Sequence, residues 1–565
     1  MSSVLTNKFR IHNAKSFKEG FNEAEFTNIY TTIGKINPWL STDIYAGANE
    51  NTSDSNPPTP LDHVQNEYEV WRNMFAAKKV QPNDVIHVIP RVDWESGKKY
   101  TQYSDTDASL VYDIINNSTP KPFYVMTDEF NVYKCLFNNN EDSTVKPTGT
   151  STIPLPTSDG YIWKYMYTVS ASSAFKFMTE NFIPVQTLEE QPAGGSVCSS
   201  GNLQWEVQEY AKNYGKGKIE VISRNYGEFG SGGSGYISES GTTVGSYNYD
   251  SNSDVTEITV NGTLSKSDDY YNDMTVYFET EQLSFLIKDF TTAVGVNIND
   301  TIVLEGDASS IISTSFKILP TVKIEGDGSG AVAIPIMGSP SLGSSTDQID
   351  KVKILNGGSD YTSASVTFVN ANGVSNTDAK FDVMIPPVGG HGSDAIKELG
   401  GFFIMINTRF QYNEYDFPVD NDYRQISLIR HPKKSDGTDA SDDAYIQCKT
   451  LVVSISNIDE TSGSLGFDQT LSQDQGNGKF LNATIVDVLD DSVNNNKKIR
   501  IVGSSEDFSL STPLSSSSGA VISSIDSIEN VGLMEDSGDV IFVEQRRSIQ
   551  RDASQVEDIK IILEF

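Results

Sequence analysis

Four residues that can take part in chemistry lie close together in the stretch HVIPRVDW. His87 can transfer a proton near neutral pH, and Trp94 can stack on a ring or fill a core. Arg91 and Asp93 are two positions apart, so in an extended chain they share one side and can form a charge-assisted pair. Pro90 has no backbone N–H and should end the strand or lie at a sheet edge. We therefore predict a structural corner in which Trp94 covers the ion pair; the alternative is a binding contact at the same residues.

The rest of the chain has no signature of a catalytic nucleophile or of a phosphate-binding loop. No G-x-S-x-G sequence stands between a strand and a helix, as a nucleophile elbow requires. The stretch GDGSG, residues 326–330, lacks the Lys-Ser/Thr of a Walker loop, and its glycine spacing differs from the dinucleotide fingerprint. We predict that the protein is not an enzyme. A pair among the 76 acidic residues leaves a glycoside hydrolase open as an alternative.

Metal-binding patterns are absent as well. The acidic run DFPVDNDYRQ, residues 416–425, lacks the glycine and final glutamate of a calcium loop and is expected to be a solvated loop. The three cysteines lie far apart, which indicates isolated thiols. No H-x-x-x-H or H-E-x-x-H spacing occurs among the histidines, which are His12, His63, His87, His391 and His431. We predict no metal site and no cofactor.

The charge of the chain argues against two classes of partner. The 42 Lys and Arg against 76 Asp and Glu give a formal net charge of −34. Such a charge repels the phosphate backbone of nucleic acids and anionic membrane surfaces. No apolar run is long enough to span a bilayer, and the N-terminal residues lack an apolar signal region. We expect a soluble protein made in a cytoplasm, with neither nucleic acid nor membrane as a partner.

Strand patterns outnumber helix patterns. Helical spacing of apolar residues occurs in KSFKEGFNEAEF, residues 15–26, and in LDHVQNEYEVWRNMFAAKKV, residues 61–80. The second segment is predicted to bury one face, formed by Val64, Tyr68, Trp71 and Phe75. Segments such as NIYTTIGK, PFYVMTDEFNVYKCLF and DGYIWKYMYTVS alternate or run apolar between turn residues, as strands do. We predict a mainly β protein with a few helices, in which a β-sandwich-type scaffold carries inserted small β domains.

Two stretches differ in composition from the rest and indicate inserted domains. Residues 223–395 and 437–529 are rich in Gly, Ser, Asp and Asn, with short apolar strands between turns. Glycine turns recur in the first stretch, as in FGSGGSGYIS and NGGSDY, which indicates small β modules. The scaffold would then comprise 1–222, 396–436 and 530–565. Because loop-closure cost grows slowly with length, the first insert is tolerable if its two ends leave the scaffold close together.

The segments outside the inserts, taken in order, resemble one family of phage proteins. They read TNKFR, IYTTIGKINPW, VIPRVDW, DGYIWKYMYTV, LQWEVQEY, DYRQISLIRHP, DSGDVIFVEQRRSI and EDIKIILEF. In sequence and order they are similar to the gene product eight family, the baseplate wedge proteins of T4-like contractile-tailed bacteriophages. The chain is longer than the family pattern, and the excess falls in the inserts. Their glycine-turn modules resemble those of marine T4-like phages and imply a cyanobacterial host.

The resemblance implies a non-enzymatic structural subunit of the virion, located in the tail baseplate. It further implies a homodimer in each wedge, contacts with the wedge proteins called gene products six, seven and ten, and a part in baseplate assembly and host-triggered rearrangement. No catalytic residue carries over from the family. Large and charged side chains within the shared motifs become candidates for structural or partner contacts: Trp39, Arg91, Asp93, Trp94, Trp163 and Arg424.

Two other functions stay open on the sequence alone. A receptor- or glycan-binding tail protein would need exposed aromatic platforms and is expected to be a trimer. A tail-associated glycoside hydrolase would need a carboxylate pair in a cleft. The oligomeric state separates the first alternative from the wedge subunit, for which the resemblance implies a dimer.

Overall fold

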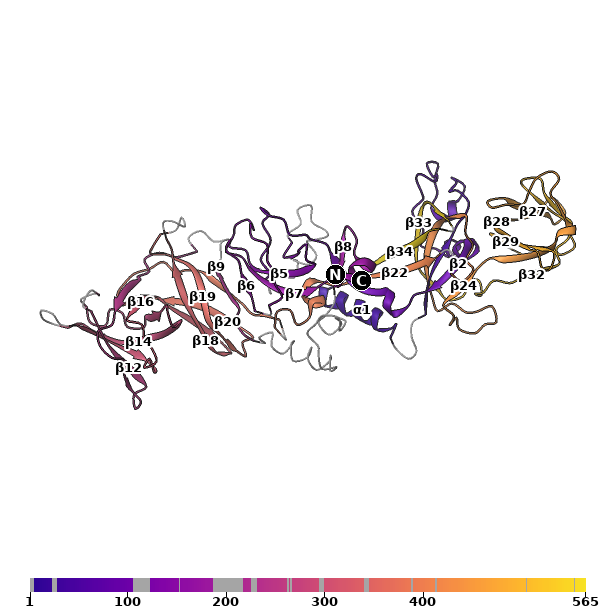
Figure 1. The fold of residues 1–565 in the computed structure, drawn as a ribbon. Coiled ribbons are helices and arrows are strands. Elements are labelled where there is room, and N and C mark those ends of the chain that lie inside the picture. Colours follow the sequence, from indigo (N-terminus) through magenta and orange to yellow (C-terminus); the bar gives the residue numbers. More distant parts are fainter. Residues whose placement is uncertain are drawn as a thin grey trace. The chain divides into compact units, whose positions relative to one another are not determined.

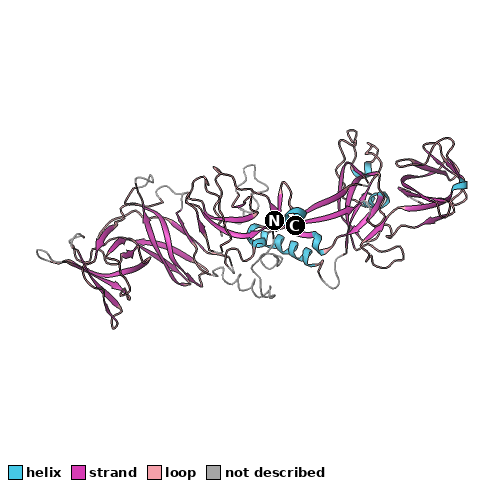
Figure 2. Ribbon diagram, viewed as in Figure 1, coloured by secondary structure: helices cyan, strands magenta, loops and turns pink. Residues whose placement is uncertain are grey.

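The computed structural model describes residues 5–22, 28–104, 122–151, 153–185, 217–224, 231–261, 264, 267–293, 299–339, 345–387, 390–411, 414–504, 506–552 and 554–565. The chain divides into two compact units: unit 1 is Met1–Ile11 with Val88–Gly401, and unit 2 is His12–His87 with Phe402–Phe565. Antiparallel strands dominate both units, and helices are few (Figure 1, Figure 2). The predicted mainly β fold is confirmed. None of the described helices is long and apolar enough to cross a membrane.

A five-stranded antiparallel sheet forms the centre of unit 2. Its order is β24–β2–β1–β23–β33, with the bounds Ala444–Ile446, Met74–Lys79, Ile29–Gly34, Asn421–Arg430 and Asp539–Arg551. Nearby in the same unit, β22 (Phe403–Gln411) pairs along its whole length with β34 (Val556–Glu564). Both groups of strands contribute buried side chains to one core, among them Phe75, Ile404 and Ile426. The early and late parts of the chain therefore fold together around a shared apolar interior.

The helices differ from those predicted. α1 is Asn7–Glu19, so it begins before the predicted segment and ends within it, while residues 23–26 of that segment lie outside the described residues. α2 is Val64–Asn73, and β2 begins directly after it at Met74. The predicted helix over residues 61–80 was therefore wrong in its second half, because pairing with β1 overrides the local helical pattern.

The predicted buried face of that segment was also partly wrong. Trp71 and Phe75 are buried, but Val64 is 61% exposed and Tyr68 is 43% exposed. The buried residues of the short helix are Asn66, Val70 and Trp71. The other described helices and helical turns are α4 (Ala171–Phe177), α6 (Ala395–Leu399), η1 (Ile44–Ala46), η2 (Pro82–Asp84) and η5 (Ile455–Asn457).

Residues 449–529 of unit 2 form an eight-stranded sheet with a core of its own. Its order is β26–β31–β30–β27–β28–β29–β25–β32, with the bounds Ile458–Asp459, Val521–Ile522, Leu514–Ser516, Thr470–Asp474, Phe480–Asp491, Asn496–Val502, Lys449–Ser454 and Ser527–Glu529. The first and last of these strands along the chain, β25 and β32, pair with Thr450 opposite Glu529. The ends of this sheet region thus lie side by side. β24, which falls inside the predicted second insert, belongs to the central sheet instead.

Unit 1 contains a four-stranded antiparallel sheet with the order β4–β5–β7–β6. The bounds of these strands are Tyr124–Met126, Asn131–Phe137, Ile162–Thr168 and Leu155–Pro156. β5 is buried at every residue, which fits its nearly continuous apolar sequence. Val88–Pro90, the end of β3 (Val85–Pro90), pairs with β8 (Phe182–Pro184).

The rest of unit 1 consists of one larger sheet and three strand pairs. The larger sheet has the order β10–β16–β13–β14–β15–β12–β11, with the bounds Glu239–Thr242, Ser315–Leu319, Thr275–Phe278, Leu283–Thr291, Asp300–Glu305, Val255–Val260 and Asn248–Asp250. The pairs are β17–β20 (Thr321–Gly326, Ala364–Val369), β18–β19 (Ser329–Met337, Ile349–Ser359) and β9–β21 (Val221–Arg224, Phe381–Met384). The larger sheet has one hydrophobic core, and the three strand pairs share another.

The two glycine turns noted in the sequence adopt matching conformations. Gly233 and Gly358 have φ values of +64° and +67°, a region that favours glycine. A tyrosine follows three positions later in each turn, and both of these tyrosines, Tyr236 and Tyr361, are buried in the core of the three strand pairs. The repeated sequence therefore builds the same local structure twice.

Candidate functional site

The stretch HVIPRVDW forms a corner whose ion pair faces solvent. β3 ends at Pro90, as predicted. Arg91 Nε lies 2.9 Å from Asp93 Oδ2, but their side chains are 30% and 47% exposed. The Trp94 indole N–H donates to Ser143 Oγ at 3.1 Å, and its ring packs against a buried aromatic cluster. The ion pair of the corner is therefore a surface feature of unit 1.

Two further residues singled out in the sequence are core residues. His87 is 1% exposed, so it is a buried residue of β3. Trp163, on β7, is fully buried, stacked on Tyr161 with ring centroids 5.3 Å apart and edge-on to Tyr100. Trp163 and Trp94 belong to the same aromatic cluster. Their role is to fill the interior beside the four-stranded sheet.

Trp39 and Arg424 meet at one carboxylate in unit 2. Asp54 Oδ1 accepts hydrogen bonds from the Trp39 backbone N–H at 2.9 Å and from Arg424 Nε at 2.8 Å, and Asp54 Oδ2 accepts from Arg424 Nη2 at 2.8 Å. The Trp39 indole donates to the Arg546 carbonyl at 2.8 Å. Hydrogen bonds from Arg424 hold the pKa of Asp54 below its usual value. This contact joins a loop to β23 and β33, so it is an anchor of the unit.

Unit 1 also contains a group of buried charged side chains that was not predicted from the sequence, and we call it the buried charge cluster. Lys134 on β5 and Lys164 on β7 are cross-strand partners, and both side chains are fully buried. Lys134 Nζ forms an ion pair with Glu398 on α6 and lies 2.8 Å from His391 Nδ1. Lys164 Nζ lies 3.5 Å from Glu220 Oε1. The cluster thus pairs two buried lysines with two buried glutamates.

Electrostatic coupling sets the protonation states within the cluster. Burial alone would raise the pKa of Glu398, but the charge on Lys134 and the contacts with His391 and Lys134 outweigh it and set the pKa at about 2. Burial, with the charge on Lys134, lowers the pKa of His391 to about 3. Burial also raises the pKa of Glu220, against the opposing charges of Lys164 and Lys134. At neutral pH His391 is therefore neutral and Glu398 is a carboxylate.

The buried charge cluster holds both flanks of the predicted first insert against one sheet. Glu220 directly precedes β9, and Glu398 lies on α6, at the two sides of residues 223–395. Glu398 Oε1 also accepts from the Gly392 backbone N–H at 2.8 Å. The pairing of β9 with β21 places Arg224 opposite Phe381 and brings these flanks together. Such ion pairs fix the position of the two flanks relative to the sheet. They do not have the geometry of a catalytic nucleophile with its base.

One sequence signal could have found half of the cluster. Lys134 and Lys164 each stand inside a buried apolar run, in NVYKCLF and IWKYMYT. A lysine in such a run is rarely fully buried without a partner. Nothing local identifies the partners, since Glu398 is 264 residues away from Lys134.

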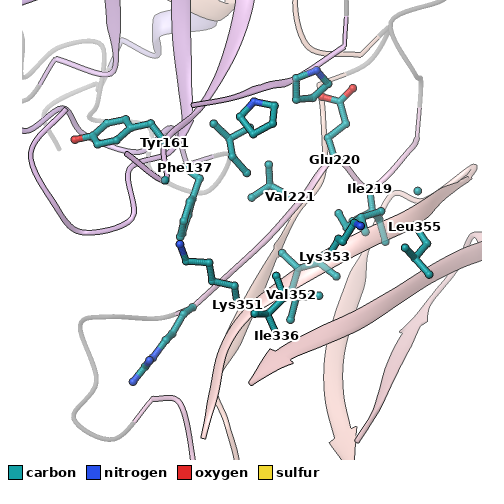
Figure 3. A pocket seen from close by; sticks show the side chains of 18 of the residues that line it. Phe137, Tyr161, Ile219, Glu220, Val221, Ile336, Lys351, Val352, Lys353 and Leu355 are labelled. Carbon is teal, nitrogen blue, oxygen red and sulfur yellow. The ribbon is translucent and has the colours of Figure 1, made fainter. Parts of the chain in front are cut away.

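A cavity of about 630 Å³ lies beside Glu220 (Figure 3). Apolar side chains from β9, β18 and β19 line much of it, among them Val221, Ile336, Val352 and Leu355. Figure 3 shows Glu220 on the opposite side of the cavity from Ile336 and Val352. The charged residues that line it are Lys218, Glu220, Arg224, Asp350, Lys351 and Lys353. Within the described ranges, no group of three His, Cys, Asp or Glu residues is placed to hold a metal ion, at this cavity or elsewhere.

The chain is similar in sequence to phage tail proteins. Residues 3–153 match the family model described as "Bacteriophage T4, Gp8". A protein of Enterobacteria phage T4, described as baseplate wedge protein gp8, is 26% identical over 244 residues, which cover 38% of this chain and 69% of that relative. The matched residues 3–153 include Trp39, Asp54 and the Arg91–Asp93 corner.

Proposed function

We infer the function of this chain from its membership of the Gp8 family of bacteriophage baseplate wedge proteins. The chain is a structural subunit of the baseplate wedge in a phage tail, and it interacts with other baseplate proteins. The observation that carries this conclusion is the likeness to the T4 protein over 69% of that relative's length. The buried ion-pair anchors in both units agree with a role in holding structure rather than in chemistry.

Mass spectrometry of purified tails and of baseplates isolated from them tests this function. The chain is expected in both preparations at constant stoichiometry to other baseplate proteins. Its absence from infectious particles would overturn the conclusion.

We propose in addition that the chain is a homodimer, that it contacts gene products six, seven and ten, and that it takes part in wedge assembly and host-triggered rearrangement. The family resemblance supports these details. An apolar surface in the matched residues supports a protein contact: Leu40, Ile44, Leu61, Val64 and Tyr68 are each at least 40% exposed. Light scattering of the purified chain should give a dimer mass, whereas a trimer would favour the receptor-binding alternative.

We propose that the chain has no catalytic activity. Support comes from the structural character of the matched family and from the use of the buried ionisable groups in ion pairs. Purified protein incubated with host cell-wall and polysaccharide fractions should release no sugar. Reproducible release that a single carboxylate substitution abolishes would establish the glycoside hydrolase alternative.

We also propose that most of residues 223–395 form modules that are separable from the scaffold. Support comes from the paired ends of this region, where Arg224 lies opposite Phe381, and from the core of the larger sheet, which lies wholly within it. Replacing residues 225–380 with a turn of about four residues would close a hairpin between these partners. This variant keeps every residue of the buried charge cluster, and it should stay soluble and bind its wedge neighbours. Aggregation under conditions where the full chain is soluble would contradict separability.

A further inference from the structure

We propose that the cavity beside Glu220 receives an acidic, partly apolar polypeptide segment of a neighbouring baseplate protein. This inference rests on the proposed function, which places the chain among other proteins in an assembly. It adds a contact surface to which the predicted insert contributes ten of the 23 lining residues, and only two of the 23, Phe137 and Ile153, lie within the residues 3–153 that match the family model.

The charges around the cavity oppose those of the chain as a whole. Four cations and two acids line it, so the local balance is +2, whereas the whole chain carries −34. Arg224 pairs with Asp350 at 3.7 Å. Lys218, Lys351 and Lys353 form no ion pair in the part of the chain that the structure describes, and Lys353 Nζ donates a hydrogen bond to Gln282 Oε1. These lysines form a positively charged surface that can attract carboxylates. Because the chain as a whole is negatively charged, an acidic partner would be repelled by most of its surface and attracted to this place.

The walls of the cavity favour an apolar side chain. Ile336 is 41% exposed although it lines a concave surface, and Val352 and Leu355 are only partly buried. A volume of about 630 Å³ lies within the usual range for binding pockets and accommodates one or two large side chains. Covering these apolar groups would remove them from water and supply the main favourable free energy of contact.

Glu220 favours a peptide over other amphipathic anions. Its side chain is 7% exposed, and its Oε2 atom accepts no hydrogen bond from any described residue. A buried carboxylate oxygen without a partner is costly, and turning the Glu220 side chain toward a donor on the occupant would relieve that cost. A peptide backbone offers N–H donors next to apolar and acidic side chains. A fatty acid has an apolar chain and a carboxylate but no such donor.

Site-specific photocrosslinking in assembled tails tests the proposal. The probe is p-benzoylphenylalanine introduced at Ile336, which lines the cavity, with Val332 as the matched control position. Val332 lies on the same strand and is 40% exposed, but it does not line the cavity. The Ile336 probe should form a crosslink to one segment of another baseplate protein, and mass spectrometry should find acidic residues next to an apolar residue in that segment. The Val332 probe should not reach that segment.

Charge reversal adds a second readout. Lys351→Glu should lower the yield of the Ile336 crosslink roughly tenfold, because it places a carboxylate against an acidic segment. Lys288→Glu makes the same change in charge at an exposed lysine on β14, away from the cavity, and should leave the yield unchanged. Exchanging an acidic residue of the crosslinked segment for lysine should restore the yield in the Lys351→Glu background.

Three outcomes would overturn the proposal while leaving the proposed function intact. These are tails that contain the chain but give no crosslink from position 336, a crosslink to a segment without carboxylates, and a crosslink to lipid or glycan. Tails that lack the chain altogether would instead overturn the proposed function.

Discussion

Two places in unit 1 hold the same kinds of charged groups in opposite environments. Arg91 and Asp93 pair at 2.9 Å on the surface, where water screens them. Lys134 and Glu398 pair where both side chains are at most 2% exposed. The surface pair joins residues that are neighbours in sequence, whereas the buried pair joins β5 to α6. Burial and sequence separation, rather than the chemistry of the groups, decide which pair matters for the fold.

Breaking the buried pair should have the largest effect. Glu398→Gln leaves the Lys134 ammonium buried without its counterion, which costs about 3–5 kcal/mol. Hydrogen exchange measured by mass spectrometry should show faster exchange across β5 and β7. The matched control is Asp128→Asn, which breaks the exposed pair with Lys146 near the same sheet and should change little. Equal effects from the two substitutions would show that burial does not distinguish them.

Acid should weaken the buried pair in a defined pH range. The pKa of Glu398 is 4.5 in the unfolded chain and about 2 in the folded protein. Its contribution to stability is therefore complete above pH 4.5 and is lost as the pH falls toward 2, a change of about 3 kcal/mol. Glu220, whose pKa is raised, acts in the opposite direction, whereas His391, whose pKa is lowered to about 3, adds a further loss of stability as the pH falls below 6.5. Protection factors at β5 and β7, which correct exchange rates for the slower intrinsic exchange at low pH, should decrease between pH 4.5 and 2.5 in the native protein. Glu398→Gln should make that decrease smaller. An identical pH profile in both proteins would be inconsistent with the assigned role.

The anchor in unit 2 should show an intermediate effect. Arg424 is 5% exposed, but its partner Asp54 is 36% exposed, so water reaches one side of the pair. Arg424→Ala should cost about 2 kcal/mol, because it removes hydrogen bonds to a carboxylate. Arg430→Ala, on the same strand, breaks the exposed pair with Asp539 and serves as the control. Hydrogen exchange in β23, followed as denaturant is added, measures the free energy of unfolding of both variants. A smaller loss of stability for Arg424→Ala than for Arg430→Ala would contradict the prediction that the less exposed pair contributes more.

The surface corner should show the smallest effect on stability. Arg91→Ala should change the free energy of unfolding by less than about 1 kcal/mol, because the pair is exposed. Thermal melting of the full chain provides the measurement. Unchanged melting together with reduced incorporation into baseplates would assign the corner to a partner contact. A large drop in melting temperature would contradict the assignment of the corner as an exposed pair.

The strands and their order in the sequence could be predicted because their patterns are local. Alternating and continuous apolar runs predicted β1, β5 and β7, and Pro90 predicted the end of β3. Where a local pattern competes with a distant partner, prediction fails: the helical pattern over residues 61–80 gives way at Met74, where the chain pairs with β1. The ordered motifs also pointed to the family that the comparisons support.

The sequence by itself determined the mainly β fold class, the residues at which strands end, and the resemblance of the chain to a protein family. Each of these depends on neighbouring residues or on the order of motifs along the chain. Only the tertiary structure decided which charges are buried and with what they pair. Glu220 and Glu398 are two among 76 acidic residues, and nothing in their neighbourhoods marks them. They differ from the other acidic residues only in the folded protein, where β5 and β7 place two lysines side by side and each glutamate pairs with one of these lysines. The physical reason is that desolvation depends on everything that packs around a group, and most of what packs around these groups is far away in the sequence.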